Sequence, residues 1–210
     1  MSRLSQVRAG LALLAVLACL SFSPPPDQLK EGDIIFHQGQ SSQSQALILA
    51  LDSRYTHMGM ILKRDGRWVV LEAVQPVRYT GLRTFIARGK GRHYVIKRLK
   101  RADRVVTPEV IREMKGIARG LLGRDYDLQF MWSDRRWYCS ELVWKLYERT
   151  TGVKIGTLKP VKELDVDLSH PLVQRKLRQR YGGKIPYDEP VMPPSEMFAS
   201  DLLETVVEYP

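Results

Sequence analysis

The sequence predicts a single α+β domain, and three patterns support this prediction. Two strand-like runs meet at Asp65-Gly66, another strand-like run covers residues 93–99, and helical patterns with one apolar side cover residues 107–123 and 139–152. The chain has 210 residues, of which 44% are hydrophobic and 27% charged. Such a chain is long enough and apolar enough to bury one proper core.

The N-terminus has the organisation of an export signal. Arg3 and Arg8 precede an apolar stretch from Ala9 to Leu20, and no acidic residue interrupts it. The stretch is shorter than the run of about 20 apolar residues that spans a bilayer. We therefore expect a signal peptide at 1–18, a proline-rich linker at 19–28 and the single domain at 29–210. An uncleaved membrane anchor is the alternative.

The tetrapeptide VLAC, from Val16 to Cys19, is similar to a bacterial lipobox, in which the cysteine receives lipid and becomes the new N-terminus. Ordinary cleavage after Ala18 is the alternative. If Cys19 is lipidated, Cys139 is the one free cysteine of the mature chain. An unpaired thiol in an oxidising compartment indicates a functional role. The other two interpretations are a small core residue and a disulfide with an unlipidated Cys19.

The strand-like runs on either side of Asp65-Gly66 predict a β-hairpin with a two-residue turn. In that register, paired residue numbers add up to 131. One face is then wholly apolar and should belong to the core; it carries Met58, Met60, Leu62, Val69, Leu71 and Ala73. On the other face, Glu72 lies opposite Gly59 and diagonal to His57, within hydrogen-bonding reach of its ring. A surface His–Glu pair is the alternative.

Two further elements follow the hairpin. The run from His93 to Leu99 reads as a strand, which makes His93 a structural residue. The next pattern is a helix with Thr107 as its cap, Pro108 at its first position and Gly123 as its stop. Its expected core-facing positions are Val110, Ile111, Met114, Ile117, Ala118, Leu121 and Leu122.

Cys139 begins the second predicted helix, which ends at Gly152. Cys139 shares an apolar stripe with Leu142, Val143 and Leu146, whereas the charged residues Glu141, Lys145, Glu148 and Arg149 fall outside this stripe. Free backbone N–H groups at a helix start favour a thiolate. Cys139 is therefore a candidate nucleophile, and such a cysteine needs a base, usually histidine.

His57 is the candidate base, because Glu72 can fix its tautomer and leave the other ring nitrogen to face Cys139. His37 directly follows the strand-like GDIIF run and could line the same site, with a loop histidine as the alternative. His170 lies in a polar loop. The histidines form no metal-binding pattern with a second cysteine, so the sequence predicts neither a zinc site nor a cofactor.

Four segments together resemble a known family: LKEGDIIF (29–36), THMGMI (56–61), VLEA (70–73) and YCSELVWKLY (138–147). They resemble the YiiX/YebB-like group of circularly permuted papain-like cysteine hydrolases, which are related to the NlpC-type cell-wall peptidases. IPYDEP, followed by SEMF, resembles the C-terminal part of that group.

The resemblance implies a permuted papain-like α+β fold, with an antiparallel sheet packed against the nucleophile helix, a thiol nucleophile and no metal. In the permuted order, histidine and its polar partner precede the cysteine, as His57 and Glu72 precede Cys139. We also expect the Cys139 N–H to contribute to an oxyanion hole. Tyr138 either adds a hydroxyl there, shapes the pocket, or simply packs beside the helix.

The net charge of +10 gathers in two basic runs, at 88–104 and 175–180. Such runs are usually solvated faces, and in an exported protein they attract anionic envelope polymers or lipid head groups. The signal peptide argues against nucleic acid as a partner.

We therefore expect an exported thiol hydrolase of the periplasm or cell envelope, held at the membrane by a lipid anchor, that cleaves an amide or ester bond in cell-wall peptide. The first alternative is a hydrolase or acyltransferase acting on lipid acyl amides or esters. The second alternative is a catalytically silent envelope-binding module on the same fold.

Overall fold

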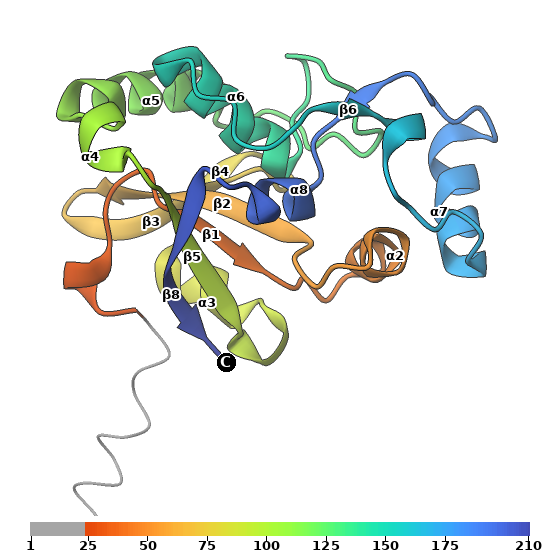
Figure 1. Ribbon diagram of the computed structural model, residues 1–210, viewed down its shortest axis with the longest axis horizontal. Coiled ribbons are helices and arrows are strands. Elements are labelled where there is room, and N and C mark those ends of the chain that lie inside the picture. The colour runs from red at the N-terminus through yellow and green to blue at the C-terminus, as the bar shows by residue number, and fades with distance from the viewer. Residues whose placement is uncertain (1–23) are drawn as a thin grey trace, which may run out of the picture.

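A six-stranded antiparallel sheet forms the centre of the fold (Figure 1). The structure is a computed structural model that describes residues 24–210. The strand order is β4-β3-β2-β1-β5-β8, and every neighbouring pair is antiparallel. The strands are β1 Ile34–His37, β2 His57–Arg64, β3 Arg67–Glu72, β4 Arg78–Gly81, β5 Tyr94–Leu99 and β8 Leu203–Tyr209, and a separate small sheet joins β6 Lys159–Pro160 to β7 Pro190–Val191.

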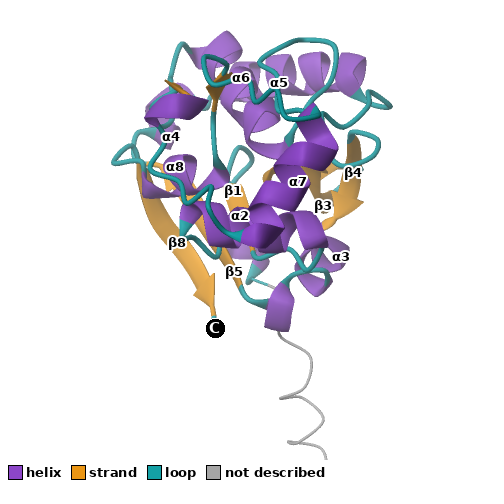
Figure 2. Ribbon diagram, turned by 90° about the vertical axis from the view of Figure 1, so that its right-hand side faces the viewer, coloured by secondary structure: helices purple, strands orange, loops and turns teal. Residues whose placement is uncertain are grey.

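Helices cover both faces of this sheet, so the predicted α+β class is confirmed. The α-helices are α2 Ser42–Leu51, α3 Leu82–Ala87, α4 Ala102–Val105, α5 Pro108–Leu121, α6 Cys139–Thr151, α7 Pro171–Tyr181 and α8 Pro194–Ala199, with short 3-10 turns at Pro26–Gln28, Lys90–Arg92 and Val161–Glu163. Helices α5 and α6 lie on one face and α3 on the other (Figure 1). Helices α2 and α7 pack together beyond one end of the sheet (Figure 2).

The hairpin has the predicted register, with Arg64 opposite Arg67 and Met60 opposite Leu71. Both turn residues adopt positive φ, 50° at Asp65 and 73° at Gly66, as a tight hairpin turn requires. The predicted apolar face is buried in the main core beneath α6, although Val69 is only partly covered. The hairpin register therefore follows from the local sequence.

The opposite face of the sheet is also covered, which the sequence analysis did not anticipate. A second core cluster joins Ile35, Ile61 and Val70 of the sheet to Phe85 and Ile86 of α3. The helix α3 has only six residues and lacks a side-chain cap, so it gives little periodic signal in the sequence. It matters for the site because the face it covers is the one that carries His57 and Glu72.

The Gly-Asp pair of the LKEGDIIF segment has a structural role. Asp33 accepts two hydrogen bonds from the Arg98 side chain, at 2.6 and 2.8 Å, and this pair ties β1 to β5. Gly32 has a φ of 92°, and its carbonyl accepts a hydrogen bond from the Tyr147 hydroxyl of α6. This motif thus fixes α6 to β1 at the centre of the sheet.

Helix α5 agrees with its prediction except at one position. Thr107 caps it by accepting a hydrogen bond from the Val110 N–H, and Pro108 is its first residue. The expected inward positions are buried or packed on the core apart from Leu122, which is 36% exposed. The prediction for Leu122 was wrong because the helix ends at Leu121 and the chain leaves the helical path there.

Helix α6 also departs from the expected one-sided pattern. Glu141 and Lys145, which fall outside the apolar stripe, are buried and form an ion pair with a distance of 2.6 Å. Lys145 also lies over the rings of Trp132 and Trp137. The segment before the helix therefore folds back over its charged side, and the first two turns of α6 are enclosed on all sides.

The predicted signal peptide and Cys19 lie outside the described residues, so the expected boundaries at 18 and 28 stay predictions. Within residues 24–210, no helix has both the length and the apolar character needed to cross a membrane.

Gly59 lies where the hairpin leaves no room for a side chain. A Cβ atom placed on Gly59 would lie 2.4 Å from Cγ1 of Val70 and 2.7 Å from the carbonyl oxygen of Leu71. We expect Gly59→Ala to lower the free energy of unfolding by about 1–3 kcal/mol through overpacking, measured by urea denaturation. Gly116→Ala in the middle of α5 is the control, because only the tip of a flexible arginine lies near its added methyl group. It should raise the free energy of unfolding by up to about 1 kcal/mol. Equal stability of Gly59→Ala and the wild type would contradict the steric argument.

Candidate active site

Cys139 is the first residue of α6 and is 4% exposed. The N–H groups of the first helical residues have no partner within their own helix. The thiol therefore lies close to several backbone donors that carry partial positive charge. The Tyr138 N–H donates to the Glu141 carboxylate across the helix start, at 3.4 Å. Cys139 therefore lies at the helix start, as the sequence predicts, and the first turn of α6 is buried.

His57 and Glu72 are hydrogen-bonded to each other. The distance from His57 Nε2 to Glu72 Oε2 is 2.7 Å. The Glu72 side chain has no exposed surface and that of His57 is 14% exposed. Because Gly59 presents no side chain between them, the diagonal contact expected from the hairpin register forms.

Glu72 has two further partners that the sequence analysis missed. Its Oε1 accepts hydrogen bonds from the Thr80 hydroxyl and from Nη2 of Arg88, both at 2.5 Å. Burial alone would raise the pKa of Glu72, but the hydrogen bonds from His57 and Thr80 and the charge of Arg88 outweigh it and lower this pKa to about 2. The carboxylate is therefore ionised throughout the physiological range.

Different signals could have revealed these two partners. Thr80 lies opposite Val70 in the β3–β4 pairing, so a strand assignment for 78–81 would have placed its hydroxyl on the face that carries Glu72. Arg88 immediately follows α3 and reaches Glu72 only because that helix folds across the sheet. Arg88 therefore leaves no local signature in the sequence.

The imidazole of His57 also meets the thiol of Cys139. Burial would lower the pKa of His57, but hydrogen bonds and charge interactions with Cys139 and Glu72 outweigh burial and raise this pKa to about 9. Since Nε2 is engaged by Glu72, Nδ1 is the ring nitrogen left for the sulfur. The structure thus brings Cys139, His57 and Glu72 into one chain of contacts, with His57 protonated at neutral pH.

His37 lies next to this chain of contacts. It pairs with His57 across β1 and β2, the two ring centres are 5.3 Å apart, and its ring stacks on Phe85 at 4.4 Å. Burial and the positive charges of His57 and Arg88 hold the pKa of His37 well below its usual value. His37 is therefore a neutral ring packed behind His57, and it lines the adjoining cleft.

Tyr138 shapes the site, and its hydroxyl has a backbone partner. The Met192 N–H donates to the Tyr138 hydroxyl at 3.2 Å, and the Ser140 hydroxyl donates to the Met192 carbonyl at 2.5 Å. These two bonds fix the segment around β7 against the start of α6. Of the three expectations for Tyr138, its position favours a role in pocket shape.

Tyr126 is a site residue that the sequence analysis did not identify. It forms a parallel bridge with Trp137, which brings the loop before α6 back to the helix start. Its hydroxyl accepts a hydrogen bond from Nε2 of Gln43 at 3.1 Å. Burial and the nearby charge of Cys139 raise the pKa of Tyr126, so its hydroxyl keeps its proton. Loop position alone gave no reason to select it from nine tyrosines.

The other two histidines serve the fold. His93 is buried beside the ring of Tyr55, directly before β5, as expected for a structural residue. His170 caps α7, where its Nδ1 accepts a hydrogen bond from the Leu172 N–H.

Comparisons with known proteins agree with this architecture. Residues 28–207 match the family described as permuted papain-like amidase enzymes, YaeF/YiiX. A curated Escherichia coli relative, named uncharacterized protein YiiX, is 40% identical over 198 residues, which make up 94% of this chain and 93% of the relative. The crystal structure of an E. coli protein described as metalloprotein YiiX matches with a TM-score of 0.80 and 43% identity, over 87% of this chain and 98% of that one.

The description of that crystal structure raises the question of a metal in this chain. Within residues 24–210, no three His, Cys, Asp or Glu side chains are grouped so that they could hold a metal ion. At the site itself, Nε2 of His57 and both oxygens of Glu72 already have hydrogen-bonding partners. The residues present do not fit a bound metal, and we derive no chemical step through one.

The raised pKa of His57 makes a testable prediction. In wild-type protein labelled with NMR-active isotopes, the midpoint of the His57 imidazole titration should lie near pH 9. Glu72→Gln should lower this midpoint by about one pH unit or more, because an adjacent carboxylate stabilises the imidazolium. The stabilising contribution of this contact is fully present below the ordinary histidine pKa of about 6.5 and is lost as pH rises through about 9. Glu113→Gln on the exposed side of α5 is the control. An unchanged midpoint in Glu72→Gln would refute the proposed coupling.

Proposed function

The chain belongs to the YaeF/YiiX family of permuted papain-like amidases, and from this premise we propose that it is a cysteine hydrolase that cleaves an amide or ester bond with Cys139 as nucleophile and His57 as base. The observation that carries the proposal is the fixed imidazole, whose Nε2 is held by buried Glu72 while its other nitrogen meets the thiol. This is the nucleophile–base–orienter arrangement of acyl-transfer enzymes.

The acylation step begins with the proton of the Cys139–His57 pair on the imidazole of His57. The sulfur attacks the carbonyl carbon of the substrate, a C–S bond forms, and the carbonyl electron pair moves to oxygen. When the tetrahedral intermediate collapses, the bond to the leaving amine or alcohol breaks, and the proton on His57 passes to that leaving group. The product of this step is a thioester on Cys139.

Deacylation reverses these proton movements. Water adds to the thioester carbonyl while His57 takes its proton, and the C–S bond breaks to release a carboxylic acid. Cys139 leaves as the thiolate beside the imidazolium, so the starting state is restored. Overall, one water molecule is consumed for each amide or ester bond cleaved.

Two donors can stabilise the oxyanion that forms in each step. One is the backbone N–H of Cys139 at the start of α6. The other is the Tyr126 hydroxyl, which accepts a hydrogen bond from Gln43 and therefore keeps its own proton available. In this proposal Glu72 is a positioning residue, because it acts on the substrate only through His57.

Export remains part of the proposal and rests on the sequence of residues 1–20. In this view the chain is secreted, cleaved before Cys19 and anchored by lipid, so the hydrolase works in the cell envelope. Cell-wall peptide was the expected substrate class, with lipid acyl amides and esters as the alternative.

The nucleophile is tested by substitution and by thiol labelling. Cys139→Ser should reduce turnover to background without changing the circular dichroism spectrum or the melting temperature, because the hydroxyl occupies nearly the same volume. In the wild type, iodoacetamide should label Cys139 rapidly, because His57 can take up the thiol proton and the thiolate is the reactive species. Full turnover in purified Cys139→Ser would exclude the mechanism. Slow labelling, with no hydrolysis of any substrate tested, would support the silent binding module.

The export prediction is tested by intact-mass spectrometry of protein isolated from membranes. We expect a chain that begins at Cys19 and carries lipid. Cys19→Ala should abolish the lipid mass, whereas Cys139→Ala should retain it. A free Met1, or cleavage at another position, would contradict the lipoprotein assignment, and cleavage at Cys19 without lipid would leave export alone standing.

A further inference from the structure

The loop before α6 fixes the backbone of Tyr126 beside the thiol. The Tyr126 N–H donates to the Gln75 side chain at 2.7 Å, and Tyr126 also forms the bridge to Trp137. Burial, followed by the charge of Cys139, raises the pKa of Tyr126, so the hydroxyl keeps its proton. Tyr126 and Cys139 line the same cavity. What the loop does not set is the direction in which the hydroxyl proton points.

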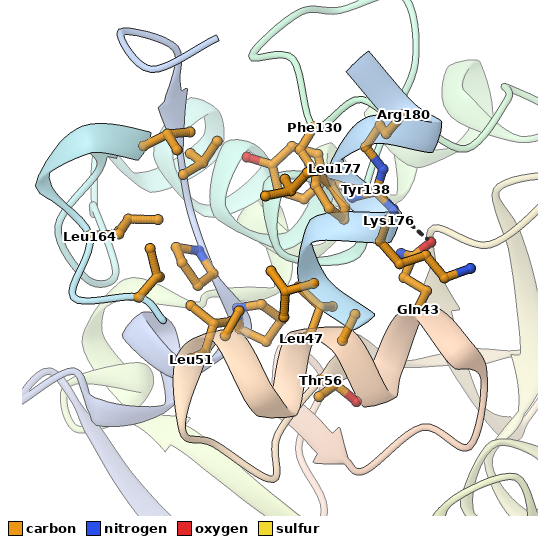
Figure 3. Close-up of a pocket in the computed structure, with 18 of the residues that line it drawn as sticks. Gln43, Leu47, Leu51, Thr56, Phe130, Tyr138, Leu164, Lys176, Leu177 and Arg180 are labelled. Carbon is orange, nitrogen blue, oxygen red and sulfur yellow. Dashed lines mark hydrogen bonds between the residues drawn. The ribbon is translucent and has the colours of Figure 1, made fainter. Parts of the chain in front are cut away.

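Two hydrogen bonds in series lead from α7 to this hydroxyl. Nη2 of Arg180 donates to Oε1 of Gln43 at 3.3 Å, and Nε2 of Gln43 donates to the Tyr126 hydroxyl at 3.1 Å. Figure 3 shows Arg180 meeting Gln43 between α7 and α2, at the side of the cavity. Gln43 belongs to the first turn of α2, so the series joins three segments that are far apart in the sequence.

The chemistry of Arg180 fixes the direction of both bonds. A guanidinium has only donors, so the amide of Gln43 must turn its oxygen to Arg180 and its nitrogen to Tyr126. An amide nitrogen also only donates, so the Tyr126 oxygen must accept and its proton must point away from Gln43. Within residues 24–210, no hydrogen bond donated by this hydroxyl is found. The proton is therefore available to a group bound beside Cys139.

Contacts with the Tyr126 loop hold Arg180 in place. The guanidinium lies over the ring of Phe130 at 4.4 Å, and the hydroxyl of the next residue, Tyr181, donates to the Gln129 carbonyl at 2.6 Å. Helix α7 thus contacts the loop at two neighbouring residues, and these contacts bring the guanidinium to Gln43. An arginine stays charged at every physiological pH, so this arrangement does not titrate.

We propose that Gln43 and Arg180 are positioning residues that orient the Tyr126 hydroxyl proton toward the oxyanion of the reaction. This inference rests on the proposed function, since it takes Cys139 as the nucleophile and Tyr126 as an oxyanion donor. A donor that is already oriented needs no rearrangement when negative charge develops on the carbonyl oxygen. Both residues act through Tyr126, so α7 contributes to catalysis through two hydrogen bonds.

A link that merely joins α2 to α7 would respond differently to one substitution. Gln43→Glu keeps the shape of the side chain and converts its bond with Arg180 into an ion pair, so the two helices stay joined. The carboxylate only accepts, however, so the Tyr126 hydroxyl must donate to it and turn its proton away from the oxyanion. This change therefore separates the direction of the proton from the packing of the helices.

The main test is hydrolysis of p-nitrophenyl butyrate by the purified full-length chain. Gln43→Glu should lower kcat about 100-fold with little change in KM, the loss typical of one oxyanion donor, and Tyr126→Phe should lose a similar factor. The double variant should be no slower than Tyr126→Phe, because both changes remove the same donor. Losses that multiply in the double variant, or an unchanged kcat in Gln43→Glu, would overturn the inference while leaving the thiol hydrolase intact.

Matched variants control for charge and for folding. Gln45→Glu adds the same charge to the same helix at an exposed position that lines neither space, and it should keep the wild-type kcat. Arg180→Met should lower kcat about two- to tenfold, because the Gln43 amide can then take either orientation. Arg180→Lys should lose less, since lysine still donates. If Gln43→Glu does not fold, these two variants carry the test, with the exposed Arg178→Met as their control.

Iodoacetamide labelling distinguishes an effect on the oxyanion from an effect on the thiol. Alkylation of Cys139 forms no oxyanion, so its rate in Gln43→Glu should stay within about twofold of the wild-type rate. Slowing of labelling by the same factor as turnover would show that the substitution acts on the thiol or on His57, and would overturn the inference.

An aldehyde adduct separates this inference from the proposed function. Butanal labelled with ¹³C at its carbonyl carbon should form a hemithioacetal, in which sulfur bonds to that carbon and the thiol proton passes to its oxygen. Its dissociation constant, measured by ¹³C NMR, should rise about fivefold or more in Gln43→Glu, the effect of one lost hydrogen bond. This weakening without any ester hydrolysis would overturn the hydrolase and support the oriented donor. Equal dissociation constants would overturn the oriented donor, and neither adduct nor hydrolysis would overturn both.

Discussion

The buried carboxylate of Glu72 is the constraint on which the rest of the site depends. An ionised carboxylate without exposed surface must be fully hydrogen-bonded, and here its partners come from β2, from β4 and from the residue after α3. Removing one partner of such a group typically costs about 3–5 kcal/mol. The same contacts that hold the edge of the sheet together therefore orient the imidazole of His57, so site geometry and folding stability are coupled through one side chain.

Helix α6, which begins at Cys139, is held by a second, independent set of buried polar contacts. The Tyr147 hydroxyl binds the backbone at Gly32, and the Glu141–Lys145 ion pair lies under the preceding loop. At the helix start, Tyr138 and Ser140 bind the two backbone groups of Met192. These contacts prevent rotation of α6 about its axis, so the sulfur stays directed at His57.

Two spaces adjoin the site, a cleft lined by His57 and a cavity lined by Cys139, and the cleft is the more polar because different layers of the fold supply them. The cleft at His57 is lined by strand ends and by Arg88, where backbone and side-chain polar groups reach the surface. The cavity at Cys139 is supplied by α2, α7 and the 161–168 segment, a layer outside both cores. Loop residue Tyr126 lines both spaces.

The sequence by itself determined the features whose physics is local. The Asp65-Gly66 turn sets the hairpin register, and the period of two then places His57 and Glu72 on one face, diagonally across Gly59. The helix start at Cys139 and the cap at Thr107 follow from propensity and capping. Only the tertiary structure decided what surrounds these residues. Arg88 and Tyr126 reach the site through packing between separate elements, the Glu141–Lys145 pair is buried because the loop before α6 folds back over it, and α2 meets α7 across more than 100 residues of chain. No local pattern encodes such contacts, because the period of a strand or helix specifies which side is apolar but not what covers it.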